Sequence, residues 1–207
     1  MKKRILSLAL SAAMALTMLP TGAFAAGDKG KPPVYNKATG CYEISTPDQL
    51  LYLSGSWKDG APRDGHYVLT ADIDMSGIKG FKPIASKKDK GFIGTFDGQF
   101  HSIKGLRVEY EKKYAGLFGY VGNQDDQAYI KDVALLDCYV TGQQNVGALA
   151  GVNYGTITGC VVTGEVKCLD LSNSHTAGGI CGKLKEGEGP IVGHVEDCYV
   201  NADVSAP

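Results

Sequence analysis

The stretch YAGLFG at residues 114–119 recurs as VGALAG at residues 146–151 and as AGGICG at residues 177–182. The closing glycines of the three blocks are 32 and then 31 residues apart. A unit of this length is too short to bury its own apolar side chains, whereas stacked units cover one another. The sequence therefore predicts that the chain is built from stacked repeats.

A second block of strand-forming residues accompanies each of these stretches. It reads CYVTG at 138–142, CVVTG at 160–164 and CYVNA at 198–202. In the middle copy, Cys160, Val162 and Val166 have even spacing, which places their side chains on one face of an extended chain. The 28 glycines supply the tight turns between short strands. These features predict an all-β protein folded as a parallel β-helix, or β-solenoid.

The number of residues between the two kinds of block varies from copy to copy. The excess is predicted to form surface loops at 123–127, 167–174 and 185–190, because these segments are polar or contain glycine. Such loops are where we expect a binding specificity to be carried.

The N-terminal half is predicted to cap the stack and supply its first coils. Thr46-Pro47-Asp48-Gln49 has an N-cap residue, a proline at the first helical position and a capping-box glutamine, which together predict a short helix. Strands are expected over 67–75, 92–96 and 100–108. We divide the chain into an extension (26–42), a cap with the first coils (43–113) and the repeat coils (114–207).

Residues 1–25 are typical of a secretory signal peptide. Three basic residues precede an apolar run, and Ala23-Phe24-Ala25 provides a cleavage pattern, so we expect cleavage near Ala25. The remaining chain has 18 basic and 22 acidic residues, a net charge of −4, which argues against nucleic-acid binding. The mature chain has no other long apolar run and is not expected to insert into a membrane. The predicted location is secreted or cell-surface.

The repeat blocks resemble the GLUG-motif family of bacterial secreted and surface proteins. The resemblance rests on Gly116-Leu117-Phe118-Gly119, on the blocks at 146–151 and 177–182, and on the pattern from Ile157 to Gly164. It implies a right-handed β-helix with a short N-terminal capping helix. Such repeats occur in adhesin-like proteins and beside the catalytic part of M26-type immunoglobulin A peptidases.

The peptidase activity is not expected to transfer to this chain. A zinc-binding HExxH helix needs two histidines one turn apart, and His66, His101, His175 and His194 are all far from one another in sequence. We therefore predict no metal site, no cofactor and no catalytic residue.

The carboxylates are candidates for catalysis or calcium binding, because some β-helix enzymes cleave polysaccharides with acidic side chains gathered on one wall. Asp72 and Asp74 are expected on one face of a single strand, where calcium binding stays an alternative. Asp137 and Asp197 precede cysteines taken as equivalent, but Gly159 interrupts that row. A structural role is the preferred interpretation for Asp72, Asp74 and also Asp97.

Six cysteines follow the predicted signal peptide. We expect Cys138, Cys160 and Cys198 to occupy one repeat position as buried free thiols. A bridge between Cys168 and Cys181 stays an alternative, and Cys41 has no assigned role.

These observations favour a non-enzymatic secreted or surface protein that takes part in adhesion or displays loops to an extracellular glycan or protein. A structural spacer is the alternative, and a polysaccharide-degrading enzyme is the least favoured function. Tyrosines or Trp57 aligned along one face would favour glycan binding, because aromatic rings stack on sugars.

Overall fold

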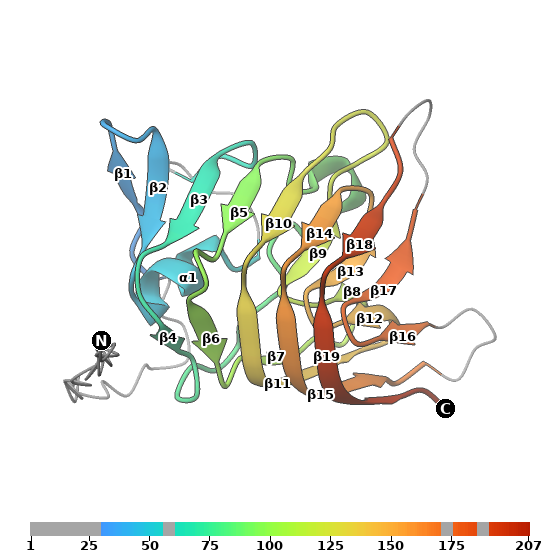
Figure 1. Ribbon diagram of the computed structural model, residues 1–207. Helices are drawn as coiled ribbons and strands as arrows, with labels where there is room; N and C mark the ends of the chain where they lie inside the picture. The colour runs from blue at the N-terminus through green and yellow to red at the C-terminus, as the bar shows by residue number, and fades with distance from the viewer. Residues whose placement is uncertain (1–29, 56–60, 171–175, 186–190) are drawn as a thin grey trace, which may run out of the picture.

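The computed structural model describes residues 30–55, 61–170, 176–185 and 191–207. The predicted signal peptide, Trp57 and His175 lie outside these residues, as do parts of the predicted loops 167–174 and 185–190. Within them the protein is all-β, as predicted, with one α-helix and one 3-10 helix. The strands form four sheets, and Figure 1 shows their units following one another from β1 at one end to β18 and β19 at the other.

Two of the sheets are large. The seven-stranded sheet comprises, in spatial order, β1 (Val34–Asn36), β2 (Cys41–Ile44), β3 (His66–Leu69), β5 (Thr95–Asp97), β10 (Tyr129–Lys131), β14 (Thr156–Thr158) and β18 (His194–Glu196). The six-stranded sheet comprises β19 (Tyr199–Ser205), β15 (Val161–Cys168), β11 (Ala134–Gly142), β6 (Ser102–Lys104) and β4 (Ile73–Asp74), with β7 (Arg107–Glu109) also paired to β11.

The other two sheets have three strands each and contain the repeated hexapeptides. One consists of β8 (Lys113–Ala115), β12 (Gln144–Gly147) and β16 (Ala177–Gly178). The other consists of β9 (Phe118–Val121), β13 (Ala150–Asn153) and β17 (Cys181–Leu184).

Each repeat pairs in parallel with the next, as stacked units require. Ile130 of β10 lies opposite Ile157 of β14, which in turn lies opposite Val195 of β18. Ile130 and Ile157 are fully buried and belong to one continuous hydrophobic core. The repeat period thus brings equivalent apolar side chains into contact along the stack.

The predicted right-handed parallel β-helix is wrong. The strands lie in separate sheets and do not form a closed solenoid, and the largest sheet is mixed because β1 and β2 pair antiparallel. The two three-stranded sheets begin only at β8 and β9; ahead of them, Ile84 and Phe92 make isolated bridges to Phe118 and Val121. A sequence period requires neighbouring units to stack, but closure requires every unit to supply a strand to every sheet, which the first units do not do.

The N-terminal strands are also shorter than predicted. The expected strand over 67–75 is divided between β3 and β4, which belong to different sheets, so the prediction that Asp72 and Asp74 share one strand is wrong. The strand expected over 100–108 is divided into β6 and β7 by a bend at Gly105, whose backbone is left-handed with φ of 65°.

The three cysteines taken as equivalent do not share one position. Cys160 and Cys198 directly precede the paired residues Val161 and Tyr199, so these two are equivalent. Cys138 instead lies opposite Gly164, because the register between β11 and β15 shifts between Leu135 and Cys138. The extra residue of β11 forms a β-bulge that the sequence repeat does not reveal.

The short helix α1 (Pro47–Leu53) is confirmed, with the predicted capping box. Gln49 donates its backbone N–H to the Thr46 hydroxyl at 3.4 Å, and the Gln49 side chain accepts from the Thr46 backbone N–H at 3.1 Å. Leu50 and Leu53 are buried, which attaches the helix to the core.

Replacing the capping hydroxyl tests how much α1 depends on it. We expect Thr46→Ala to lower the free energy of unfolding by about 1 kcal/mol, because a helix N–H loses its acceptor. Urea denaturation followed by circular dichroism measures this change. Thr46→Ser keeps the hydroxyl and serves as the control; equal stability of all three proteins would contradict a role for the cap.

Candidate functional site

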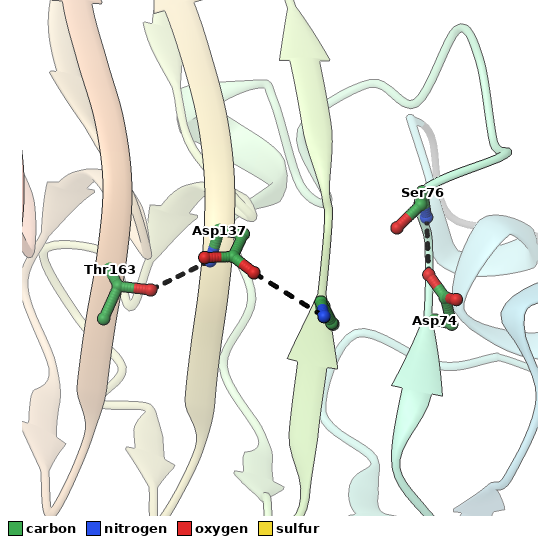
Figure 2. A network of polar contacts seen from close by, with 5 residues as sticks. Asp74, Ser76, Asp137 and Thr163 are labelled. Carbon is green, nitrogen blue, oxygen red and sulfur yellow. Dashed lines mark hydrogen bonds and ion pairs between the residues drawn. The ribbon is translucent and has the colours of Figure 1, made fainter.

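The carboxylates considered in the sequence analysis take part in local polar contacts. Figure 2 shows Asp74 and Asp137 on different strands of the six-stranded sheet. Asp74 accepts the backbone N–H of Ser76 at 2.9 Å, and hydrogen bonds from the Ser76 side chain and from this N–H lower the pKa of its carboxyl. Asp137 lies in the β11 bulge, where its backbone N–H donates to the Thr163 hydroxyl at 2.9 Å and its carboxylate lies 3.8 Å from the Lys104 ammonium.

Asp72 and Asp97 are likewise bound to neighbouring backbone. Asp72 accepts the N–H of Ser102 at 2.7 Å, which lowers the pKa of its carboxyl, and lies 3.5 Å from His101. Asp97 accepts the N–H of Gln99 and forms a 2.7 Å ion pair with Lys131. None of these four carboxylates lines either of the two hollows described below.

Three successive units turn from the seven-stranded to the six-stranded sheet at an equivalent residue. These residues are Asp132, Gly159 and Asp197, all with left-handed φ between 50° and 63°. Asp137 is not part of this row, so its predicted equivalence to Asp197 is wrong. Aspartate tolerates the left-handed conformation better than most residues, which accounts for its place beside a glycine here.

Histidines and cysteines do not gather into a metal site in the described part of the chain. No group of three or more metal-ligating side chains is present among the described residues. Burial raises the pKa of the Cys160 thiol to about 12 and that of Cys181 to about 11, which makes both poor nucleophiles. The Cys168 thiol donates to the backbone carbonyl of Gln143 at 3.0 Å.

A candidate site lies where the two three-stranded sheets meet. Tyr120, Val152 and Tyr154 form a small apolar cluster separate from the main core, and Tyr114 packs against it. The rings of Tyr114 and Tyr120 are 4.8 Å apart between centroids. These four side chains line a hollow of about 280 Å³, which we call the tyrosine groove.

The backbone beside the groove is strained at two equivalent positions. Tyr114 and Asn145 lie opposite each other in β8 and β12, between the paired residues on either side, and have φ of 71° and 53°. A left-handed tyrosine is uncommon and unfavourable by roughly 1 kcal/mol or more, and such strain collects at functional sites. Both residues line the same hollow.

Hydrogen-bonding groups complete the tyrosine groove. Gln144 and Asn145 of β12 contribute amides, and the Asn145 side chain accepts from the Thr176 hydroxyl at 2.7 Å, which fixes its orientation. Burial raises the pKa of Tyr120, and a hydrogen bond with Tyr114 contributes to the same shift. Burial also raises the pKa of Tyr154. The Tyr120 and Tyr154 hydroxyls therefore stay neutral at physiological pH.

A second hollow of about 520 Å³ adjoins the tyrosine groove and shares Lys88 and Tyr154 with it. Its rim is formed by Arg63 and Asp89 on one side and by the segment 123–126 on the other. Asn123 holds that segment in place by accepting the backbone N–H groups of Asp125 and Asp126, each at 2.7 Å. We call this second hollow the mixed-charge groove.

Sequence reasoning found part of this site and missed the rest. Residues 123–126 of the predicted loop 123–127 line the mixed-charge groove, and Lys185, from the predicted loop 185–190, lines the tyrosine groove. The repeat pattern identifies Tyr114 only as the first residue of a repeat block. One signal could have identified Tyr114, namely that it differs in residue type from Asn145, the residue at the aligned position of the next copy.

Comparisons with known proteins give a fold and two sequence relatives. No family model matches the chain, so membership of the GLUG-motif family stays a prediction. The chain is 32% identical over 151 residues to halomucin from Haloquadratum walsbyi, covering 68% of this chain and 2% of halomucin. It is 32% identical over 101 residues to a "Putative Gly-rich membrane protein" from Evansella cellulosilytica, covering 44% of this chain and 11% of that protein.

One solved structure shares the fold. It is described as "a putative immunoglobulin A1 protease from Bacteroides ovatus" and matches with a TM-score of 0.66 at 23% identity, covering 86% of this chain and 52% of that one. This likeness agrees with the part of the predicted resemblance that names immunoglobulin A peptidases, and it shows the fold alone. No helix in the described part of the chain is long and apolar enough to cross a membrane. The chain spans only a small part of each sequence relative, and these relatives indicate a surface-associated class of protein.

Proposed function

We propose that this chain is a secreted or cell-surface module, without catalytic activity of its own, that binds an extracellular glycan in the tyrosine groove and so contributes to adhesion. The observation that carries the proposal is a tyrosine cluster that lies outside the core and lines a hollow together with oriented amides. The sequence relatives support a surface location for such a module.

The chemistry of the groove suits a sugar. A saccharide presents apolar C–H faces and many hydroxyls, so its sites combine aromatic surface with a few fixed polar groups. Tyr114 is half-buried and offers the accessible ring, whereas Tyr120 and Tyr154 are only 4% and 3% exposed and form the floor. Gln144 and Asn145 provide amide donors and acceptors for hydroxyl groups.

A spacer function is the second candidate, and the last strand favours it. Strand β19 is the edge of its sheet in the described part of the chain, and Tyr199, Val200 and Val204 on it are exposed. An exposed apolar edge strand can pair with a further strand. A spacer would have no ligand in the tyrosine groove, which the following experiment distinguishes.

The test is saturable binding of the purified full chain to a glycan array, followed by calorimetry on the ligands found. We expect Tyr114→Asn to weaken binding at least tenfold, because the ring is lost while asparagine tolerates the left-handed backbone. The matched control is Tyr129→Asn, since Tyr129 is exposed on the seven-stranded sheet. Melting temperatures confirm that both variants are folded. Absence of glycan binding, or binding that Tyr114→Asn leaves unchanged, would overturn the proposal.

A further inference from the structure

We infer that the tyrosine groove selects an anionic saccharide, one whose terminal sugar carries a carboxylate or a sulfate. This inference rests on the proposed function and adds the class of ligand to it. It is carried by three lysines that line the groove and have no ion-pair partner among the described residues.

The three lysines come from two segments that are far apart in the sequence. Lys88 belongs to the 3-10 helix η1 (Lys88–Lys90), Lys183 to β17, and Lys185 follows the end of that strand. All three line the tyrosine groove, and none of the other described residues that line it is acidic. The groove therefore has a local charge of +3 in a chain with a net charge of −1.

Some lysines elsewhere in the described part of the chain are paired with a carboxylate. Lys104, Lys131 and Lys167 lie within 4 Å of Asp137, Asp97 and Glu165, respectively. No ion pair among the described residues involves Lys88, Lys183 or Lys185. Three cations of like sign around one hollow repel each other, and a bound anion relieves that repulsion.

Strand register places the charge beside the tyrosines. Tyr120, Val152 and Lys183 lie opposite one another on β9, β13 and β17, so they form one row across the three-stranded sheet. Tyr114 and Tyr154 line the same hollow, so a ligand oxygen here lies near tyrosine side chains as well as ammonium groups. Charge-assisted hydrogen bonds from ammonium groups are stronger than neutral ones.

The adjoining mixed-charge groove sets the direction of the ligand. Asp89, Asp125 and Asp126 line it against Arg63 and Lys88, so its local charge is −1. An anionic sugar is therefore attracted to the tyrosine groove and repelled from its neighbour. The volume of about 280 Å³ is just below the roughly 300–1,000 Å³ of drug-sized ligand sites, which suits a single terminal sugar unit.

The test uses probes that differ only in charge. Oligogalacturonate is compared with its methyl ester, and dextran sulfate with dextran, by calorimetry on the full chain at two salt concentrations. We expect at least one acidic probe to bind tenfold or more tightly than its neutral partner and to weaken as salt rises. Comparison of the two acidic probes shows whether carboxylate or sulfate is preferred.

The lysines are tested by the double variant Lys183→Gln with Lys185→Gln. We expect it to abolish the preference for the acidic probe. Lys37→Gln with Lys79→Gln removes the same charge from exposed positions that do not line the groove and is expected to keep the preference.

The other outcomes separate the two proposals. Equal binding of acidic and neutral probes would overturn the inference and leave the glycan-binding function standing. An acidic preference that survives in the Lys183/Lys185 variant would also overturn it, because the attraction would then come from elsewhere. Failure of every saccharide in the probe set and the array to bind would overturn both.

Discussion

The Leu149→Asp variant is expected to be unfolded at room temperature. Leu149 is fully buried in the continuous core, and its backbone N–H and carbonyl pair with Ile180 and Phe118 in the units on either side. Removing the leucine side chain alone costs about 2–5 kcal/mol, and an unpaired buried carboxylate adds several more. That total is comparable with the roughly 5–15 kcal/mol by which a folded domain is stable.

Far-UV circular dichroism and a thermal melt measure this effect. Leu169→Asp is the matched control, because Leu169 is 56% exposed just after β15 and a charge there stays in water. We expect the control to melt within a few degrees of the parent protein. An unchanged melting temperature for Leu149→Asp would refute its place inside the core.

Gly164→Ala is expected to destabilise the fold strongly although it adds only one methyl group. Gly164 has φ of 131°, and a Cβ there would lie 2.1 Å from the carbonyl oxygen of Cys138. An alanine at this position must therefore adopt an unfavourable backbone conformation, and the adjacent strand β11 must move away from its Cβ. We expect a loss of about 3 kcal/mol in the free energy of unfolding.

Urea denaturation of Gly164→Ala and of a control variant measures the change in the free energy of unfolding. Gly77→Ala is the control, because a Cβ at Gly77 would meet no heavy atom within 4 Å. We expect its midpoint to stay within experimental error of the parent's. If Gly164→Ala were equally harmless, the close approach of β11 and β15 at the bulge would be wrong.

The sequence carried the features that depend on neighbours in the chain or on the repeat. Thr46 and Gln49 are three residues apart, so their capping box could be predicted from local pattern. The burial of Leu149 followed from its place in a repeated block. Both inferences use interactions that the period or a single helical turn already defines.

Other features depend on contacts that no local pattern contains. One extra residue before Cys138 shifts the register of β11, which separates Cys138 from Cys160 although both begin similar blocks. Sheet closure likewise depends on whether the first units contain all the strands. The repeat could not show that Ile84 and Phe92 would form only single bridges.

The candidate site was the least predictable part. The tyrosine groove combines Lys88 with Tyr114 and Lys185, which are far apart in the chain and meet only after the units stack. The chemistry of the groove depends on which charged side chains meet on the surface. The repeat pattern, in contrast, indicates which side chains face the core.

The parallel stacking also has a consequence for the order in which the protein folds. Val195 of β18 pairs with Ile157 of β14, and Ile157 pairs with Ile130 of β10. Each of these strands therefore pairs with the corresponding strand of the unit that precedes it in the chain. A chain emerging from the ribosome can therefore add one unit at a time onto a template that already exists. Nucleation is expected to be slow, because the first pairing must close a long loop, and growth after it fast.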